Sequence, residues 1–542
     1  MELGSSLCFD DVLMEPLYSD ISTRRDISLE TNIATNNRKL ILKTPLISSP
    51  MDTVSETEMA IKMALCGGLG IIHRYMSVDE QVSQVVKVKR FLQYIIKNPY
   101  RVLPDMNLVD IENLIEQYGV STFCVVDSME SNRLIGILTH RDIENMKYNL
   151  GGEFGQRYGY HDSNQNWIDT HPPNKHEILV QNNMTMIGDG ISNGLVITIT
   201  MEGEIETVPE TILQRAKQLM MDRRIEKIPI VSSGSSNGTD RKLLGLITLK
   251  NIRHWENNKS KACIDANGAL CVGAAIGIIG DYMERLEELV KAGVDLICID
   301  VANGFNSNVI DITRDIRAKY PLLPLMVGNV CNWQGYEALA MLDIDCIRVG
   351  VGNGSICTTR LETGIGKGQF SAVAECFRFK TVNYKLPHII CDGGSLGKTG
   401  NKVKALACGA SAIMLGRTLA STEEAPGQII YRNGRRFKYI RGMASTMANI
   451  SKQEKVSNGN GTNSNKKIKT DFTAEGVDGE QELSGSVADL IEQINGGLKS
   501  GLSYLGCKNI TQVHEKNIKN EIRFNIVSSI GMTENGIRVK TY

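Results

Sequence analysis

One cysteine of this chain stands in a loop that suits nucleophilic chemistry. Residues 346–360 read CIRVGVGNGSICTTR, so that a short apolar strand leads into a loop with three glycines before Cys357. Glycines let a backbone approach a ligand closely, and such a loop can offer N–H and C=O groups to a phosphate or a cation. A thiolate at Cys357 could attack a bound electrophile, and Thr359 could position or relay a proton. The other cysteines are expected to be small core residues.

Acidic and glycine residues end several later apolar runs. Asp392 is followed by two glycines, Gly416 is followed by Arg417, and Asp300 ends another run. An aspartate at a strand end can accept hydrogen bonds from ribose hydroxyls, and glycine-rich turns there can bind phosphate. The alternatives are a simple turn at Asp392 and a helix cap at Asp300. Several such turns together favour nucleotide binding, and no GxGxxG follows an early strand to support a Rossmann-type site.

The elements that must position these residues form a regular pattern. Eight continuously apolar runs are joined by helical patterns such as 78–91 and 281–292, and most runs end in Gly, Asn, Asp or Ser. Buried parallel strands are continuously apolar, and eight βα units predict an α/β fold, a closed (β/α)8 TIM barrel with its chemistry at the strand ends. The predicted strands are 46–49, 68–73, 271–275, 296–300, 325–329, 346–349, 388–392 and 412–416.

An internal repeat interrupts the barrel after its second strand. Residues 134–143 recur as 243–252, and each copy follows a helix and a strand. The repeat resembles a tandem pair of CBS modules, which in other proteins often bind adenine or guanine nucleotides; the alternative is a degenerate pair that binds nothing. We expect a first barrel part at 1–97, the inserted pair at 98–256 and the rest of the barrel at 257–542. Within the insert, 98–150 and 194–256 are the modules and 151–193 is an extended loop.

A polar segment follows the last predicted strand. Residues 451–467 are rich in Asn and Gly and poor in apolar residues, and they lie in a barrel loop. We expect a mobile flap over the site at about 446–483, and the alternative is a disordered insert without a catalytic part. Helical periodicity returns at 485–506.

Composition limits the function classes. The net charge is −1, so no overall field recruits nucleic acid or an anionic membrane. The 13 cysteines include no CxxC pair, which argues against a disulfide framework or a zinc site. The N-terminus shows no signal peptide, and the longest apolar run, 270–280, is too short to span a bilayer. We expect a soluble protein of the reducing cytoplasm.

Together these residues resemble the family of IMP dehydrogenases and GMP reductases. The similarity covers essentially the whole chain, and the cysteine loop is its most specific motif. The matching stretches are 9–13 (FDDVL), 48–54 (SSPMDTV), 352–360 (GNGSICTTR), 363–366 (TGIG), 392–394 (DGG), 423–427 (EEAPG) and 441–445 (RGMAS).

The resemblance implies a covalent chemistry at the purine base. The Cys357 thiolate would add to C2 of the purine, a hydride would pass between C2 and nicotinamide, and Thr359 and Glu475 would assist. The nucleotide is expected at Ser49, Asn329, Arg348, Ser355, Asp392, Gly394, Gly416, Arg417 and Gly442. The cofactor is expected at Asp300, Asn303, Gly350 and Gly352. A potassium ion is expected at the backbone carbonyls of Gly352, Gly354 and Cys357.

The flap favours a reductase. Dehydrogenases of the family hydrolyse the adduct with an Arg–Tyr pair on the flap, whereas 446–474 contains neither Arg nor Tyr. Its basic residues are lysines, and a solvated ammonium is a poor base near neutral pH. Reductases release ammonia and need no hydrolytic base, and 300–304 and 371–376 are similar to reductase segments. The inserted pair and 424–427 look dehydrogenase-like, however, and Thr446 stands where reductases carry a Glu that assists deamination.

We therefore expect a GMP reductase that uses NADPH. The alternative is an NAD-dependent IMP dehydrogenase, and a more remote one is a catalytically inactive nucleotide-sensing barrel. The residues alone do not choose between the cofactors, because no Arg near Asp300 is recognisable as a partner for a 2′-phosphate. The resemblance also implies a homotetramer that pairs into octamers through the CBS modules, which could take ATP or GTP.

Overall fold

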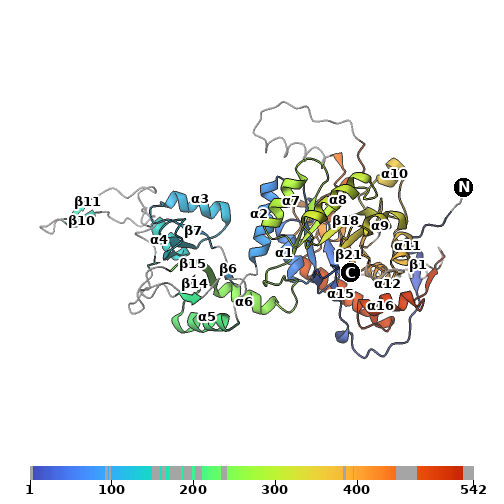
Figure 1. Ribbon diagram of the computed structural model, residues 1–542, viewed down its shortest axis with the longest axis horizontal. Coiled ribbons are helices and arrows are strands. Elements are labelled where there is room, and N and C mark those ends of the chain that lie inside the picture. The colour runs from blue at the N-terminus through green and yellow to red at the C-terminus, as the bar shows by residue number, and fades with distance from the viewer. Residues whose placement is uncertain are drawn as a thin grey trace. The chain divides into compact units, whose positions relative to one another are not determined.

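The chain divides into two compact units. The computed structural model describes residues 4–91, 95–96, 99–148, 159–161, 167–169, 185–186, 198–201, 210–232, 241–381, 386–394, 396–446, 448, 473–528 and 531. The first unit comprises Met1–Phe91 and Asn258–Tyr542, and the second comprises Leu92–Asn257 (Figure 1). The second unit is thus inserted between two parts of the first.

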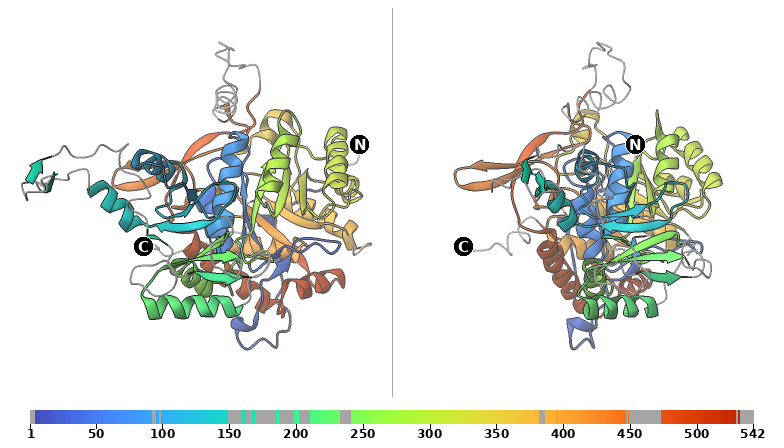
Figure 2. Two further views of the ribbon diagram at one scale, coloured as in Figure 1. Left: turned by 60° about the vertical axis from the view of Figure 1, so that its left-hand side comes forward. Right: turned by 90° about the vertical axis from the view of Figure 1, so that its left-hand side faces the viewer.

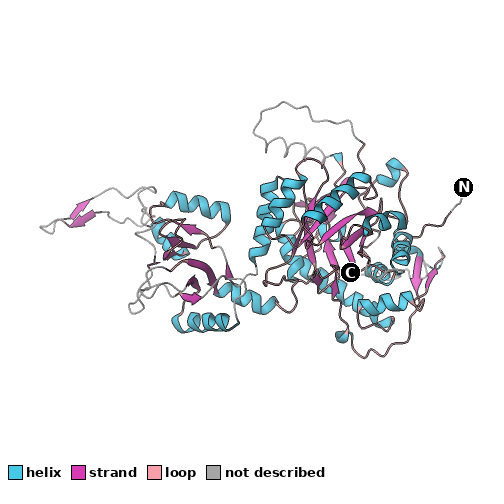
Figure 3. Ribbon diagram, in the orientation of Figure 1, coloured by secondary structure: helices cyan, strands magenta, loops and turns pink. Residues whose placement is uncertain are grey.

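The first unit is built around a closed barrel of parallel strands, which confirms the predicted (β/α)8 fold (Figure 3). Every predicted run forms a strand, because runs that are apolar throughout can be buried on both faces. Around the barrel the strands are β16 (Val272–Ile276), β17 (Leu296–Asp300), β18 (Leu325–Val330), β19 (Cys346–Val349), β20 (His388–Asp392), β21 (Ala412–Leu415), β4 (Leu46–Ser48) and β5 (Leu69–Ile72).

The barrel interior is filled by side chains from alternate strand positions. Met326, Cys346, Ile390 and Met414 belong to one buried cluster inside it. Ile33, Leu40 and Leu42 extend this cluster from the hairpin of β2 (Thr31–Asn32) and β3 (Ile41–Leu42). The interior is therefore a packed core, and the free backbone at the strand ends is available for chemistry.

Amphipathic helices surround the barrel (Figures 2 and 3). In α15, Val487, Ile491, Ile494, Leu498 and Leu502 are buried, a spacing of three and four residues that places them on one face. This helix packs against α12 and α1 and confirms the helical periodicity at 485–506. The main helices are α1 (Thr57–Leu65), α2 (Val78–Phe91), α7 (Tyr282–Lys291), α8 (Ser307–Lys319), α9 (Trp333–Ala340), α10 (Thr359–Thr363), α11 (Gln369–Thr381), α12 (Thr399–Ala407), α13 (Arg417–Ala420), α15 (Val487–Tyr504) and α16 (Ile510–Ile518).

An antiparallel ribbon follows the last barrel strand. Strands β22 (Ile429–Arg432), β23 (Arg435–Arg441) and β24 (Asp478–Glu482) pair in that order, and the first two form the orange ribbon that projects to the left in the right-hand view of Figure 2. The flap was predicted as mobile over 446–483, but its last part is the regular strand β24, whose backbone pairs with β23. Residues 449–472 of that flap lie outside the described residues.

The second unit contains two similar halves that match the sequence repeat. The first half has α3 (Leu108–Tyr118), β8 (Phe123–Val126), β9 (Leu134–Leu138) and α4 (His140–Tyr148). The second has α5 (Glu210–Arg223), β14 (Lys227–Ser232), β15 (Leu243–Thr248) and α6 (Leu249–Asn258). The halves exchange backbone hydrogen bonds, from Leu134 N–H to Arg241 O at 3.1 Å and from Leu243 N–H to Asn132 O at 2.9 Å. These nearly equivalent bonds indicate an approximate two-fold relationship between the halves.

The segment 151–193 differs from the extended loop that was predicted. Its described parts are short strands: β10 (Gly159–His161) pairs with β11 (Trp167–Asp169), and β12 (Thr185–Met186) pairs with β9. The sheets of this unit run β12-β9-β8-β7 and β13-β14-β15-β6, with β6 at Ile95–Ile96, β7 at Arg101–Val102 and β13 at Ile199–Met201.

All 13 cysteines are unpaired thiols. Most are buried, as predicted, but Cys8, Cys66 and Cys331 are only partly buried, like Cys357, so the expectation of a core position is wrong for these three. None of the helices in the described part of the chain has the length and apolar character that crossing a membrane requires.

Candidate active site

A cavity of about 350 Å³ lies at the carboxyl ends of the barrel strands. Its walls come from the loops after β4, β5, β17, β18, β19 and β20 and from two later segments, 442–444 and Glu475. Twelve of the residues predicted for the site line it: Ser49, Asp300, Asn329, Arg348, Gly350, Gly352, Gly354, Cys357, Thr359, Asp392, Gly442 and Glu475. The fold therefore gathers most of the predicted site from positions far apart in the sequence.

Cys357, Thr359 and Glu475 form a connected series in this cavity. The Cys357 sulfur lies 3.2 Å from Thr359 Oγ1, and the Thr359 hydroxyl donates to Glu475 Oε2 at 2.7 Å. A proton can therefore pass between the neighbourhood of the sulfur and a carboxylate through one hydroxyl group.

Backbone pairing fixes this geometry. Thr358 N–H donates to Glu475 O at 2.9 Å, and Val477 N–H donates to Ile356 O at 3.0 Å. Gly442 lies against the same loop, where a Cβ would approach Ile356 O to 3.0 Å, so a larger residue would push the segments apart. Glu475 is thus held by a short stretch of strand-like pairing with the cysteine loop.

Arg348 connects the two aspartates of the site. Its side chain, only 6% exposed, donates to Asp300 Oδ1 at 2.5 Å and to Asp392 Oδ2 at 2.8 Å. Burial alone would lower the pKa of Arg348, but the two carboxylates outweigh it and hold the pKa above its ordinary value. Asn329 Nδ2 also donates to Asp392 Oδ2, at 2.9 Å. Among the described residues Asp392 Oδ1 has no hydrogen-bond partner and remains available to a ligand.

Gln369 fixes the base of the cysteine loop, although no motif in the sequence singles it out. The side chain is 1% exposed, and its Nε2 donates to Val349 O at 2.7 Å and to Asp392 O at 3.1 Å. Its Oε1 accepts a hydrogen bond from Asn353 Nδ2. One amide therefore joins the carboxyl ends of β19 and β20 to the loop that carries Cys357.

Arg74 and Tyr75 form another part of the wall that was missed. They follow β5, and their place after a barrel strand is the one signal that could have identified them. The Tyr75 hydroxyl donates to Met443 O at 2.8 Å, and burial raises the pKa of Tyr75. Arg74 Nε is buried and has no hydrogen-bond partner in the described structure.

Five predicted residues lie outside the cavity lining. Ser355 is exposed on the cysteine loop, and Gly394 donates its N–H to Asn353 O at 3.1 Å. Gly416 follows Leu415, whose carbonyl accepts the Ser49 N–H at 3.0 Å. The remaining two point to other partners: Arg417 Nε donates to Gln481 Oε1 at 3.3 Å, and Asn303 Oδ1 accepts the Phe305 N–H at 3.1 Å.

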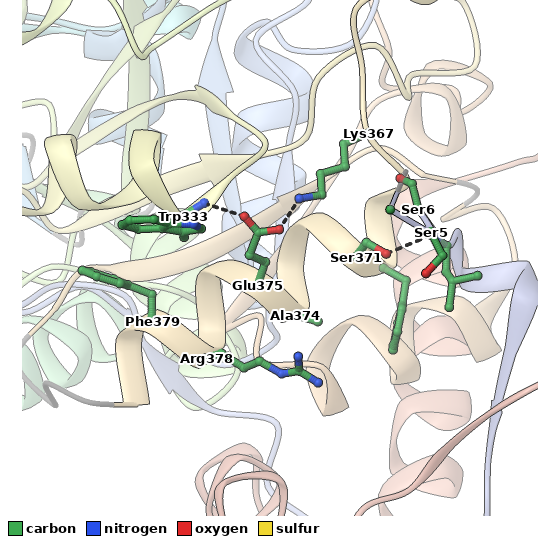
Figure 4. A pocket seen from close by; sticks show the side chains of 12 residues that line it. Ser5, Ser6, Trp333, Lys367, Ser371, Ala374, Glu375, Arg378 and Phe379 are labelled. Atoms are coloured by element: carbon green, nitrogen blue, oxygen red, sulfur yellow. Dashed lines mark hydrogen bonds and ion pairs between the residues drawn. The ribbon is translucent and has the colours of Figure 1, made fainter. Parts of the chain in front are cut away.

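A larger cavity, of about 780 Å³, lies beside α11 and the segment 4–7 (Figure 4). At one end Glu375 accepts the Trp333 N–H at 3.1 Å and pairs with Lys367, and the Trp333 and Phe379 rings stack with centroids 5.8 Å apart. The carboxylate is thus already used within the fold, and no predicted site residue lines this cavity. The predicted site residues line the smaller cavity, which contains Cys357.

Comparison with known proteins adds independent observations. The model of the IMP dehydrogenase / GMP reductase domain matches residues 6–538. The inosine-5′-monophosphate dehydrogenase of Nitrosopumilus maritimus is 36% identical over 515 residues, covering 95% of each chain. That of Bacillus subtilis is 36% identical over 513 residues, covering 94% of this chain and 92% of its own.

Solved structures are similar over the same length. A GMP reductase variant of Trypanosoma brucei in complex with guanosine 5′-monophosphate superimposes with a TM-score of 0.80 at 30% identity and covers 99% of both chains. The GMP reductase of the same organism with guanosine 5′-triphosphate gives a TM-score of 0.71 at 27% identity, covering 97% of this chain and 99% of that one.

Proposed function

Because this chain belongs to the family of IMP dehydrogenases and GMP reductases, we propose that it reduces GMP to IMP and ammonia with NADPH. The observation that carries the proposal is the series Cys357–Thr359–Glu475, in which a sulfur nucleophile and a carboxylate share one hydroxyl group. Such a series can supply the proton that a leaving amine needs.

The nucleotide lies between the strand ends in this proposal. Asp392 Oδ1 accepts the ribose hydroxyls, and Ser49 and Gly442 line the same cavity. The phosphate extends outward to groups beyond the lining. These are the Ser355 hydroxyl, the turns at Gly394 and Gly416, and the Arg417 guanidinium. Arg348 orients the Asp392 carboxylate for this contact by donating to its Oδ2 at 2.8 Å, which leaves Oδ1 facing the ligand.

The reaction begins at the sulfur. The Cys357 thiolate adds to C2 of GMP, and the bond from C2 to the exocyclic amine breaks as that amine takes a proton and leaves as ammonia. Thr359 delivers this proton from Glu475, which is 2.7 Å away. A reduced nicotinamide dinucleotide, held by the residues described in the next paragraph, would supply the hydride that C2 gains and would itself be oxidised. The carbon–sulfur bond then breaks, the thiolate of Cys357 is regenerated, and IMP is released.

The described residues fit the cofactor and the ion. Asp300 lines the cavity with Val301, Ala302, Gly350 and Gly352, so its carboxylate can take the ribose of the dinucleotide, with Asn303 following in the same loop. Carbonyl oxygens are ligands of hard cations, and the Gly352 carbonyl accepts no hydrogen bond among the described residues. This carbonyl, with those of Gly354 and Cys357, would hold a potassium ion that stiffens the loop.

A second candidate is the dehydrogenase, with which Glu475 is also compatible. A carboxylate that reaches the cavity through Thr359 can accept a proton from water as well as donate one to an amine. It could therefore hydrolyse the adduct without the flap Arg–Tyr pair. The curated relatives named above, which are inosine-5′-monophosphate dehydrogenases, support the same alternative.

A pair of absorbance assays separates the two. With GMP and NADPH, the proposal expects loss of reduced nicotinamide and release of IMP and ammonia in equal amounts. Reduction of NAD by IMP at a comparable rate, with XMP as product, would establish the dehydrogenase instead. Binding of GMP or IMP without turnover in either direction would support the third alternative, a catalytically inactive barrel that senses nucleotides.

The inserted unit is proposed as a CBS pair that binds purine nucleotides. Its two halves exchange equivalent backbone bonds, and the Trypanosoma brucei neighbour was solved with guanosine 5′-triphosphate. ATP or GTP should then change the activity or the assembly of the expected homotetramer, for example by pairing it into an octamer. No response to either nucleotide would leave the unit with a structural role.

A further inference from the structure

A separate cavity lies at the end of the barrel opposite to Cys357. It has a volume of about 360 Å³, within the range of about 300–1,000 Å³ that is usual for small-molecule sites. His388, the first residue of β20, and Ser411, which precedes β21, line it where these strands begin. The hairpin of β2 and β3 and the start of α16 complete its walls. We call it the amino-end cavity, because the barrel strands begin there.

The charges around the amino-end cavity are not balanced. Lys380, near the end of α11, lines it together with His388 and His514. In the part of the chain that the structure describes, the Lys380 ammonium has no carboxylate and no hydrogen-bond acceptor as a partner. Glu30 supplies the carboxylate of the described lining, but it pairs with Lys43 at 2.6 Å instead. An ammonium therefore lines the cavity without a counter-ion.

A lysine without a partner in a partly buried position is costly. Burial lowers the pKa of Lys380 to about 8, because the ammonium loses part of its hydration. Burial and the Lys380 charge in turn lower the pKa of His388 to about 3 and that of His514 to about 4. A negative charge in the cavity would favour the charged form of all three side chains. The lining is thus suited to an anion.

Helix α16 adds hydrogen-bond donors to the same cavity. Ile510 and Thr511, which line it, form the start of this helix. Their N–H groups have no acceptor within the helix, and no other described residue accepts from them. The Asn509 side chain caps the helix by accepting the N–H of Gln512 at 2.8 Å, one residue further on. The positive end of the helix dipole therefore reinforces the Lys380 charge.

We propose that the amino-end cavity binds the phosphate group of a small anion. The Lys380 ammonium neutralises its charge, and the first turn of α16 and the Thr511 hydroxyl supply hydrogen bonds. A tetrahedral phosphate can accept from donors on several elements, whereas a carboxylate has only two oxygens. The group belongs either to inorganic phosphate or to a small phosphate ester, which would fill more of the cavity. This site takes no part in the reaction at Cys357.

Calorimetric titration of the full-length protein tests the site. Inorganic phosphate and ribose 5-phosphate are titrated separately at pH 7.5 into the parent protein, Lys380→Gln and Lys380→Arg. Lys380→Gln should bind phosphate about 10- to 100-fold more weakly, the usual loss for a hydrogen bond to a charged group, and Lys380→Arg should keep most of the affinity. Lys291→Gln, at an exposed lysine of α7 that pairs with Glu288, is the control. Binding elsewhere in the chain would be equal in all four proteins.

The affinity for ribose 5-phosphate should also fall at high pH. Lys380 loses its proton between pH 7.5 and pH 9.5, whereas a phosphate ester, with a second pKa of about 6, stays dianionic. The other groups that face Lys380 keep their charge: His388 and His514 are neutral, Glu30 is an ionised carboxylate, and burial raises the pKa of the Cys346 thiol. We expect about a tenfold loss in the parent protein and almost none in Lys380→Arg.

The outcomes separate the two sources of phosphate. Binding of both compounds that depends on Lys380 identifies a site for inorganic phosphate, and such binding of ribose 5-phosphate alone identifies a site for a phosphate ester. Equal affinities in the parent protein and Lys380→Gln would overturn the inference, as would no binding of either compound to the parent protein. The melting temperature without phosphate should not decrease in Lys380→Gln, because the variant removes a charge that has no partner.

Discussion

The Thr359 hydroxyl lies 2.7 Å from Glu475 Oε2, although the two residues are separated by 116 positions in the chain. Thr359 begins α10 and Glu475 precedes β24, so the contact exists only because the segment after the flap pairs with the cysteine loop. The same oxygen of Thr359 is 3.2 Å from the Cys357 sulfur. A carboxylate, a hydroxyl and a sulfur thus form one path for a proton.

Replacing Glu475 by Gln should slow turnover while leaving nucleotide binding intact. The amide keeps the shape of the side chain but can no longer exchange the proton, and general acid or base catalysis contributes about 10²- to 10⁴-fold. We expect a fall of this order in kcat and a change of less than threefold in the Kd for GMP. Exposed Glu492→Gln, on α15, serves as the matched control. Unchanged kcat would remove Glu475 from the proton path.

Replacing Cys357 by Ala should abolish turnover, because no other thiol lines the cavity. GMP binding should persist, since the ribose and phosphate contacts do not involve the sulfur. Mass spectrometry of the acid-quenched wild-type enzyme during turnover should show an adduct on the peptide that contains Cys357. Residual activity above a few per cent, or an adduct on another cysteine, would contradict covalent catalysis at this residue.

The barrel and the position of Cys357 at the strand ends could be predicted from the sequence because both have local signatures. Strands that are apolar throughout can be recognised one at a time, and the glycine loop around Cys357 is continuous in the chain. Gln369 has no such signature, and for Arg74 only its place after a barrel strand could have identified it. The Gln369 side chain donates hydrogen bonds to the carbonyl oxygens of Val349 and Asp392, which lie on other strands. The Arg74 guanidinium lies against Gly277, where a side chain would crowd it. Such contacts are determined by the closure of the barrel.

The short strands were missed for a related reason. Strand β12 has two residues, Thr185 and Met186, and is defined by its pairing with β9 rather than by its own propensity. Strand β24, Asp478–Glu482, is largely exposed and polar, so its sequence resembles a loop. Its pairing with β23 supplies the backbone hydrogen bonds that stabilise it.

Replacing Gln369 by Leu should disturb the cysteine loop by removing the side chain that joins it to the ends of β19 and β20. Two carbonyl oxygens and the Asn353 amide would lose their partner in a buried site, and each unsatisfied group costs about 1–3 kcal/mol. We expect a lower midpoint of urea unfolding for the barrel and at least a tenfold lower kcat, since small misplacements of reacting groups are costly. Gln369→Asn is too short to reach both carbonyls and should behave similarly. Gln218→Leu, at an exposed glutamine, is the control, and normal kcat in Gln369→Leu would exclude a positioning role.

Two partly buried histidines should make the barrel sensitive to acid. Burial and the nearby Lys380 charge lower the pKa of His388 from 6.5 to about 3 and that of His514 to about 4. Below pH 6.5 the unfolded chain gains protons at these imidazoles while the folded chain does not, so stability is complete above that pH and falls as the pH decreases. The loss is at most about 1.4 kcal/mol per pH unit for each histidine.

Substitution of His388 tests this dependence directly. His388→Gln can keep the hydrogen bond to Ser411, which is 3.0 Å long in the native protein, but it cannot titrate. Between pH 6.5 and pH 5 its unfolding free energy in urea should therefore fall by about 1.6 kcal/mol less than that of the native protein. His140→Gln, at an exposed histidine, should show the native pH dependence. If His388→Gln loses as much stability as the native protein over this range, the acid sensitivity arises elsewhere in the barrel.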